Sequence, residues 1–221
     1  MDFEKARFNM VEQQIRPWEV LDQGVLDLLF TVKREDFVPA AYRAIAFTDM
    51  EIPLGHGQSM MSPKLEARLL QEVGIQAGER VLEIGTGSGY LTALLAARAA
   101  LVTSIEYYED FSRAAAGRLA EAGVRNIQLL VGDAATSLAA FVPATAKFDV
   151  IILTGSVPLV PAAYLQALAP KGRLFAVTGD APVMEATIHT CIGEATYRSM
   201  SLFETVLPPL INAEQPSRFA F

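Results

Sequence analysis

The sequence predicts an α/β fold, in which a doubly wound, mostly parallel sheet follows a set of N-terminal helices and ends in an antiparallel hairpin. Three observations carry this prediction. Short apolar runs alternate with helical patterns from Arg80 onward, and a glycine-rich turn joins the first run to the first of these helices. The C-terminal part instead contains two extended stretches with no helix between them. Such alternation is typical of parallel sheets that helices cover on both faces.

The N-terminal part is expected to be helical. Residues 2–15 form the first predicted helix, and Pro17 ends it because proline disfavours helical backbone in the residue before it. Residues 20–32 carry apolar side chains at helical spacing and predict a second helix. Residues 35–40 interrupt the pattern, and residues 53–63, which contain glycine and serine, are expected to form a loop.

A third helix is expected to begin at Ser62 and Pro63, since serine is a good N-cap and proline fits the first helical turn. Gly74 ends this helix. One of its faces is apolar and is formed by Leu65, Leu69, Leu70 and Val73.

The alternating part begins after Arg80. Its predicted strands are residues 81–84, 102–105, 127–131, 150–153 and 174–177. Its predicted helices are residues 90–98, 109–122, 134–141 and 161–168. A turn is expected at Lys171-Gly172, and residues 183–190 and 197–206 are expected to form the antiparallel hairpin at the sheet edge.

Composition limits the classes of protein that the chain can belong to. It has 221 residues, which favours a single domain with an N-terminal part, residues 1–75, and an α/β core, residues 76–221. A hydrophobic fraction of 52% supplies a core, and 19% charged residues argues against a disordered chain. The net charge of −7 and the pI near 4.9 argue against a nucleic-acid partner, because phosphate binding requires a basic face.

Neither a metal site nor a membrane segment is expected. The single cysteine, Cys191, can form neither an internal disulfide nor a multi-cysteine metal site. The start of the chain is charged and lacks the apolar core of a signal peptide. Prolines and glycine interrupt the uncharged run of residues 150–170, which therefore predicts a buried strand and a helix. The protein is expected to be soluble and cytoplasmic, and the sequence does not determine its oligomeric state.

The glycine-rich turn is the first candidate binding element. The strand of residues 81–84, which includes Glu83, leads into Gly85, Thr86, Gly87, Ser88 and Gly89, and a helix follows at once. Glycines permit positive φ angles and let a ligand approach the backbone, while the helix start offers free N–H groups. Taken alone, such a turn is weak evidence for a ligand.

Two acidic residues strengthen the prediction. Glu106 ends the next strand, 21 residues after Gly85, where a carboxylate can accept hydrogen bonds from both hydroxyls of a ribose. Asp133, preceded by Gly132, ends the strand after that. The carboxyl ends of successive parallel strands share one crevice, so these residues together predict a nucleoside site. Tyr107, directly after Glu106, is a candidate to lie against the base.

The spacing favours S-adenosylmethionine over a dinucleotide. Gly89 follows Gly87 by two residues, whereas the dinucleotide fingerprint has three, which disfavours a nicotinamide-dependent dehydrogenase. Glu83 would repel a pyrophosphate, but it can meet the ammonium group of an amino acid. A ribose, a base and a cationic amino-acid end together describe S-adenosylmethionine.

With these residues in place, the sequence resembles the protein-L-isoaspartate O-methyltransferase family, within the class I methyltransferases. The likeness rests on Asp36-Phe37-Val38-Pro39, on Ile52-Pro53-Leu54-Gly55-His56-Gly57-Gln58-Ser59, on Phe148-Asp149-Val150-Ile151-Ile152-Leu153-Thr154 and on residues 203–210. It covers most of residues 25–210. It implies a class I methyltransferase fold, S-adenosylmethionine as cofactor, and an isoaspartyl protein or peptide as substrate.

The resemblance also implies an acceptor loop, and there the sequence departs from the family. His56 and Gln58 match the family's loop, and Ser59 stands at its threonine position; these three are candidate catalytic residues. Met61 stands where the family has its active-site serine. Methionine cannot donate a hydrogen bond to a carboxylate. The family's Gly-Asp-Gly becomes Gly132-Asp133-Ala134, which keeps the aspartate and makes Ala134 part of the expected cofactor site.

These departures leave three functions open. The first is an O-methyltransferase for isoaspartyl residues, whose carboxylate is already ionised at neutral pH and needs no general base. The second is a methyltransferase of the same fold with another acceptor, and the third is a cofactor-binding module with little turnover. The Met61 position separates the first function from the other two.

Overall fold

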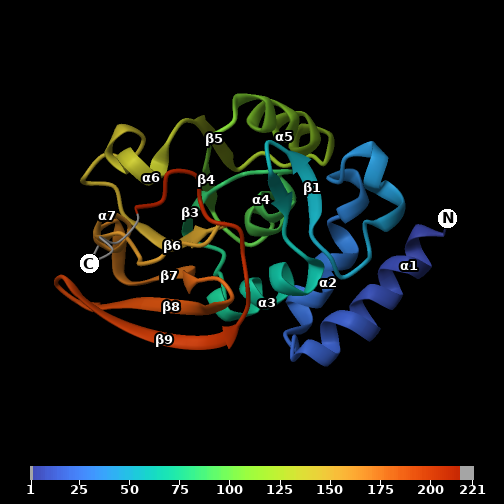
Figure 1. The fold of residues 1–221 in the computed structure, drawn as a ribbon, viewed down its shortest axis with the longest axis horizontal. Helices are drawn as coiled ribbons and strands as arrows, with labels where there is room; N and C mark the ends of the chain where they lie inside the picture. Colours follow the sequence, from blue (N-terminus) through green and yellow to red (C-terminus); the bar gives the residue numbers. More distant parts are fainter. Residues whose placement is uncertain (1, 215–221) are drawn as a thin grey trace, which may run out of the picture.

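The computed structural model describes residues 2–214 and contains a sheet of seven strands (Figure 1). The strand order is β5-β4-β3-β6-β7-β8-β9. Pairing is parallel from β5 to β7 and antiparallel from β7 to β9, so the prediction of a mostly parallel sheet with a C-terminal antiparallel hairpin is confirmed. The strands are β3 (Arg80–Ile84), β4 (Leu101–Glu106), β5 (Ile127–Val131), β6 (Phe148–Leu153), β7 (Leu168–Asp180), β8 (Val183–Gly193) and β9 (Thr196–Glu204).

Helices cover both faces of this sheet, and the alternation of side chains along the strands creates two cores. In β6, Val150 and Ile152 belong to one core, and Ile151 and Leu153 belong to the other. The first core includes side chains of α3 (Pro63–Val73), α4 (Tyr90–Ala96) and α5 (Glu109–Glu121). The second core includes side chains of α6 (Ala134–Ser137) and α7 (Ala162–Gln166). Burial on both faces explains why these strands are almost continuously apolar.

The N-terminal part is helical, as predicted, but less regular. It begins with α1 (Phe3–Met10), a π-helical turn at Val11–Ile15, a 3-10 turn at Arg16–Trp18 and α2 (Gln23–Thr31), and it continues with 3-10 segments at Arg34–Asp36 and Ala40–Ile45. Pro17 sits in the first turn of the 3-10 segment, where its missing N–H is not needed, so the helical path continues past the expected stop. The Asp22 side chain caps α2 by accepting a hydrogen bond from the N–H of Val25.

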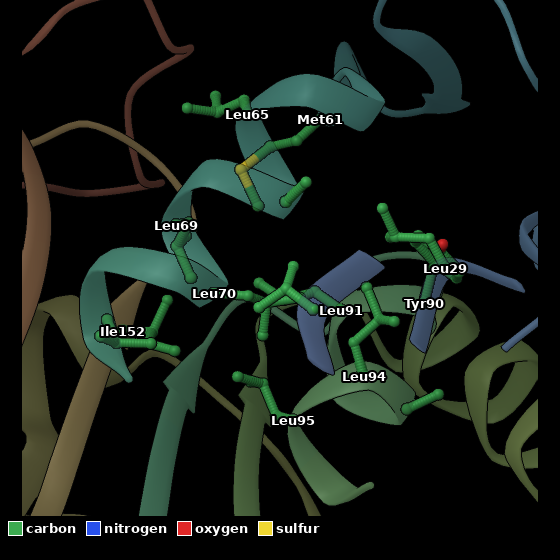
Figure 2. Close-up of a cluster of buried hydrophobic side chains, with 14 of the residues drawn as sticks. Leu29, Met61, Leu65, Leu69, Leu70, Tyr90, Leu91, Leu94, Leu95 and Ile152 are labelled. Atoms are coloured by element: carbon green, nitrogen blue, oxygen red, sulfur yellow. The ribbon is translucent and has the colours of Figure 1, made fainter. Parts of the chain in front are cut away.

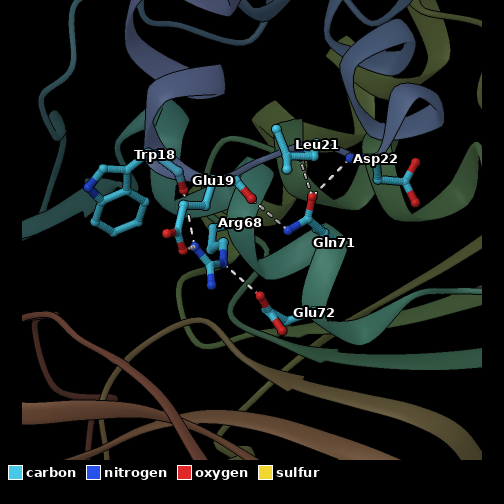
Figure 3. Close-up of polar contacts among 7 residues, drawn as sticks. All are labelled: Trp18, Glu19, Leu21, Asp22, Arg68, Gln71 and Glu72. Atoms are coloured by element: carbon cyan, nitrogen blue, oxygen red, sulfur yellow. Dashed lines mark hydrogen bonds and ion pairs between the residues drawn. The ribbon is translucent and has the colours of Figure 1, made fainter.

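The link between these helices is fastened to α3 by two polar side chains (Figure 3). Gln71 accepts hydrogen bonds from the backbone N–H groups of Leu21 and Asp22, at 2.6 and 3.0 Å, and its amide donates to the Glu19 carbonyl at 2.9 Å. Arg68 donates to the Trp18 carbonyl at 3.1 Å. The N-terminal part is therefore held against the helix that follows the expected acceptor loop.

Residues 53–63 were expected to form a loop, and that expectation is wrong. They contain most of a small antiparallel hairpin of β1 (Ile52–Gly55) and β2 (Gln58–Met60), with buried Ile52 opposite buried Met60. The turn between the strands uses positive φ angles at His56 and Gly57. Strands of three or four residues, one with a proline, are too short for their pairing to be visible as periodicity.

The end of the α/β part also differs from expectation. The predicted helix over residues 161–168 is shorter, since α7 ends at Gln166. The turn expected at Lys171-Gly172 is wrong, because β7 continues through both residues. Lys171 has a φ of 67°, and the register with β6 jumps there, which is the signature of a bulge in a continuous strand. Among the helices of residues 2–214, none has the length and apolar character needed to cross a bilayer.

Candidate functional site

A cleft lies where β3, β4 and β5 end. One wall, the strand-end side, is formed by residues 84–88, 105–108 and 132–135. The opposite wall, the hairpin side, is formed by Leu54, Gln58, Ser59, Met60, Met61 and Glu66. Glu66, Glu106 and Asp133 line the cleft, whereas no lysine, arginine or histidine of the described residues does. The charged residues that line the cleft are therefore all acidic.

The glycine loop lies in the strand-end side because its backbone takes a path closed to other residues. Gly85 has a φ of 99°, and a Cβ there would lie 2.2 Å from Oγ1 of Thr154. Thr154 follows β6, and its hydroxyl oxygen lies 2.7 Å from the Ile84 carbonyl and 2.9 Å from the Gly85 carbonyl, so it fixes the start of the loop. Gly89 caps α4 and, unlike the other four loop residues, does not line the cleft.

Glu106 ends β4 with its carboxylate beside the glycine loop. The side chain is only 5% exposed, and it accepts hydrogen bonds from the N–H of Gly87 at 2.8 Å and of Tyr108 at 3.0 Å. Each carboxylate oxygen keeps further acceptor capacity. Glu106 can therefore accept hydroxyl donors from the cleft while the backbone holds it still.

Asp133 caps α6 at the end of β5. Its Oδ1 accepts the N–H groups of Ala135 and Thr136, and its Oδ2 accepts the side-chain amide of Asn212 at 2.7 Å. Partial burial favours the protonated form, but the bonds from Asn212 and from Thr136 outweigh burial and lower the pKa of Asp133. The carboxylate is ionised and fixed in orientation. Gly132 and Ala134, its neighbours in the chain, also line the cleft.

The structure places Glu83 differently from the sequence-based expectation. Its side chain is fully buried and does not line the cleft, so direct contact with a ligand's ammonium group is not supported. Its Oε2 accepts the hydroxyls of Thr92 at 2.6 Å and Ser104 at 2.7 Å. Ser104 in turn lies 2.6 Å from the Thr86 hydroxyl, and desolvation raises the pKa of Glu83 to about 8. Glu83 therefore supports the glycine loop from the buried side, through the hydroxyls of Ser104 and Thr86.

The three candidate catalytic residues separate in the structure. Gln58 and Ser59 line the cleft from β2, and the Ser59 hydroxyl lies 2.7 Å from Oε2 of Glu51 and donates to it. His56 is at the hairpin turn and outside the cleft lining. Its ring stacks on Tyr108 with centroids 4.1 Å apart, and Nε2 lies 3.0 Å from Oδ2 of Asp110. His56 thus ties the hairpin to the start of α5.

Met61 belongs to the core as well as to the cleft. It is 6% exposed, and Figure 2 shows its side chain among those of Leu65, Leu69 and Leu91. Its sulfur therefore occupies the apolar contact between α3 and α4. A serine at the same backbone position would leave that contact empty.

A buried ion pair supports this wall from behind. Arg34 is fully buried and donates to Glu66, to the Met61 carbonyl at 2.7 Å and to the Ala46 carbonyl at 3.0 Å. Its guanidinium also lies over the Tyr90 ring, 5.1 Å from the centroid. Desolvation raises the pKa of Glu66 to about 7, although Arg34 acts in the opposite direction. Glu66 was not among the site residues expected from the sequence, although an acidic residue beside Leu65, three and four positions before Leu69 and Leu70, stands out on an apolar helix face.

Within residues 2–214, no group of three or more histidine, cysteine, aspartate or glutamate side chains is placed to hold a metal ion. His189 is half-buried beside Thr187 on β8, and burial lowers its pKa. Trp18 packs edge-on against Phe203, with centroids 5.3 Å apart, which fits a structural role.

The comparisons with known proteins agree with this geometry. The family model of protein-L-isoaspartate(D-aspartate) O-methyltransferases matches residues 5–191. A protein-L-isoaspartate O-methyltransferase of Methanoculleus marisnigri is 38% identical over 175 residues, which cover 79% of this chain and 78% of that protein. The protein-L-isoaspartate O-methyltransferase 2 of Pelobacter propionicus is 33% identical over 212 residues, 96% of this chain and 92% of that protein.

Solved structures show the same fold. A Plasmodium falciparum protein in complex with S-adenosyl-L-homocysteine matches with a TM-score of 0.81 at 17% identity, over 95% of this chain and 98% of that chain. A solved protein-L-isoaspartate O-methyltransferase matches with a TM-score of 0.76 at 23% identity, over 92% of this chain and 65% of that one. The family resemblance predicted from the sequence is confirmed: the chain belongs to the protein-L-isoaspartate(D-aspartate) O-methyltransferase family.

Proposed function

We propose that this protein is an S-adenosylmethionine-dependent O-methyltransferase that methylates the carboxylate of L-isoaspartyl residues in proteins or peptides. The observation that carries the proposal is the cleft itself. A glycine loop and two fixed carboxylates meet at the strand ends, opposite a hairpin that carries Gln58 and Ser59, in a chain of this family.

The charge of the cleft fits this cofactor. S-adenosylmethionine carries a positive sulfonium and a positive ammonium group, and the wall offers carboxylates with no basic residue among the described lining residues. A pyrophosphate is anionic, so these carboxylates would repel it. When bound, the cofactor supplies an electrophilic methyl group. Gly85, Thr86, Gly87 and Ser88 would hold its amino-acid end, Glu106 its ribose and Asp133 its base.

The acceptor needs positioning more than activation. An isoaspartyl carboxylate is ionised at neutral pH, so no residue has to remove a proton from it. Alignment of the reacting atoms and exclusion of water can lower the barrier by roughly 7–11 kcal/mol. On the hairpin side the Gln58 amide can donate to a carboxylate, whereas the Ser59 proton is already given to Glu51. Arg34 compensates the charge of Glu66, so this wall does not repel an anionic acceptor.

The test is methyl transfer from labelled S-adenosylmethionine to an isoaspartyl peptide and to its ordinary aspartyl counterpart. We expect transfer to the isoaspartyl peptide and none above background to the aspartyl peptide. Binding of the cofactor is measured in parallel by calorimetry. Cofactor binding with no transfer to either peptide would contradict the proposed acceptor, and no binding of the cofactor would contradict the proposal as a whole.

A further inference from the structure

The C-terminal strap, residues 205–212, passes over the ends of the strands and lines part of the cleft. In Figure 1 it leaves the end of β9 and runs back across the parallel strands toward α6. Buried Ser156 anchors it with three hydrogen bonds: its N–H donates to the Pro208 carbonyl, its hydroxyl donates to the Leu207 carbonyl, and its own carbonyl accepts the N–H of Leu210. Their lengths are 2.8, 2.7 and 2.9 Å.

The strap is part of the cleft wall. It contributes Leu207, Pro208, Pro209, Leu210 and Ile211 to the lining. It approaches the segment after β6 so closely that a Cβ on Gly155 would lie 2.8 Å from the Leu210 nitrogen. The match to the family model ends at residue 191, so the strap lies beyond the part of the chain that this match describes.

The strap also reaches Asp133 from outside the cleft. Exposed Asn212, with a φ of 57°, donates its side-chain amide to Oδ2 of Asp133 at 2.7 Å, while two backbone N–H groups occupy Oδ1. Three donors therefore fix the plane of one carboxylate. An ionised carboxylate only accepts hydrogen bonds, so the remaining acceptor capacity of Asp133 selects a ligand group that carries N–H or O–H.

We propose that Asn212 is a positioning residue for recognition of the nucleobase, holding Asp133 so that it accepts a hydrogen bond from the exocyclic amine of the cofactor's adenine. The inference rests on the proposed function, because it takes S-adenosylmethionine as the ligand. It adds a residue of the strap to the site and gives that residue a role in selecting adenine over a base that carries a carbonyl in place of the amine.

The experiment compares two ligands on the full chain by titration calorimetry. They are S-adenosylhomocysteine and S-inosylhomocysteine, in which a carbonyl oxygen replaces the exocyclic amine. The wild-type protein is expected to prefer the adenine compound. Asn212→Ala is expected to weaken binding of the adenine compound roughly three- to tenfold, and binding of the inosine compound much less, so that the preference narrows. Asn212→Asp, which keeps the shape but replaces the donor by an acceptor, is expected to reduce the preference for the adenine compound further.

Controls separate positioning from stability. Glu214→Gln removes an exposed charge two residues along the chain and is expected to leave both affinities unchanged. An unchanged preference in both Asn212 variants, or an equal loss for both ligands, would overturn the inference while the proposed function stands. Failure of the wild-type protein to bind S-adenosylhomocysteine at all would overturn the proposed function and the inference with it.

Discussion

The strand-end side of the cleft holds its carboxylates mainly through backbone N–H groups, whereas the hairpin side holds its polar side chains through other side chains. On the strand-end side, Glu106 accepts two backbone N–H groups, and Asp133 accepts two more together with the side-chain amide of Asn212. On the hairpin side, Glu66 depends on Arg34, 32 residues earlier in the chain, and Ser59 depends on Glu51. The same cleft therefore joins a wall that is fixed mainly by backbone donors to a wall that is fixed by side-chain partners. Substitutions should therefore affect ligand binding on one side and stability or acceptor use on the other.

The largest effect is expected from Arg34→Met, which leaves Glu66 buried without its partner. Breaking a buried ion pair on one side costs about 3–5 kcal/mol, and urea denaturation should show a loss of this size at about pH 8. The pKa of Glu66 is raised to about 7 in the folded protein, so the stability that its protonation provides is present below about pH 4.5 and is lost as pH rises through 7. Loss of Arg34 raises this pKa further, and the variant should be closer to wild type at about pH 5.

Arg43→Met is the matched control for that prediction. Its ion pair with Asp36 is half exposed on both sides, and removing an exposed pair changes the free energy of unfolding by at most about 1 kcal/mol. A loss below 1 kcal/mol for Arg34→Met at about pH 8 would mean that the hairpin side does not depend on this pair.

The second largest effect is expected from Met61→Ser, which tests whether the buried methionine increases stability at the expense of methyl transfer. The substitution removes a buried side chain from the contact between α3 and α4, and we expect the free energy of unfolding to fall by about 2–4 kcal/mol. It also restores a donor on the cleft wall, so kcat/KM for the isoaspartyl peptide should rise about tenfold well below the melting temperature. Met50→Ser, at a side chain that is 42% exposed, should change neither quantity. Unchanged stability of Met61→Ser would show that Met61 is not a core residue.

Glu106→Ala addresses the strand-end side. Loss of hydrogen bonds to a charged group should weaken binding of S-adenosylhomocysteine by about 1.5–3 kcal/mol, roughly 10- to 150-fold, measured by calorimetry. Glu109→Ala, three residues away and exposed in its pair with Arg113, is the control and should bind normally. Equal affinities for Glu106→Ala and wild type would remove Glu106 from the ribose assignment.

The same contrast explains what the sequence could and could not predict. The glycine loop, Glu106 and Asp133 were predictable because each lies at the carboxyl end of a strand, and parallel strands bring their carboxyl ends together. The direction of the Glu83 side chain was not predictable, because it depends on which face of β3 meets Thr92 and Ser104. The hairpin of β1 and β2 was not predicted for a different reason. Its strands are short, and they are defined by their pairing rather than by a periodic pattern in the sequence. The roles of Arg34, Glu51 and Asn212 arise only from contacts across the fold.

The smallest effect is expected from Glu51→Ala, and it examines how the hairpin side meets the acceptor. The Ser59 hydroxyl has one proton and donates it to Glu51, so in the wild-type protein it cannot donate to a carboxylate in the cleft. Removing the Glu51 carboxylate frees that proton and removes a negative charge from this wall. One neutral donor is worth about 0.5–1.5 kcal/mol, so kcat/KM for the isoaspartyl peptide should rise roughly two- to twelvefold, with unchanged affinity for S-adenosylhomocysteine.

The double variant Glu51→Ala with Ser59→Ala decides whether the gain comes from the hydroxyl. If Ser59 supplies the donor, the double variant should lose the gain, and the two substitutions should not be additive because the side chains are in contact. If the gain persists without Ser59, it comes from the lost charge alone, and Gln58 is then the donor that the hairpin side offers to the acceptor. A fall in kcat/KM for Glu51→Ala would instead show that Glu51 holds Ser59 in the orientation that the acceptor requires.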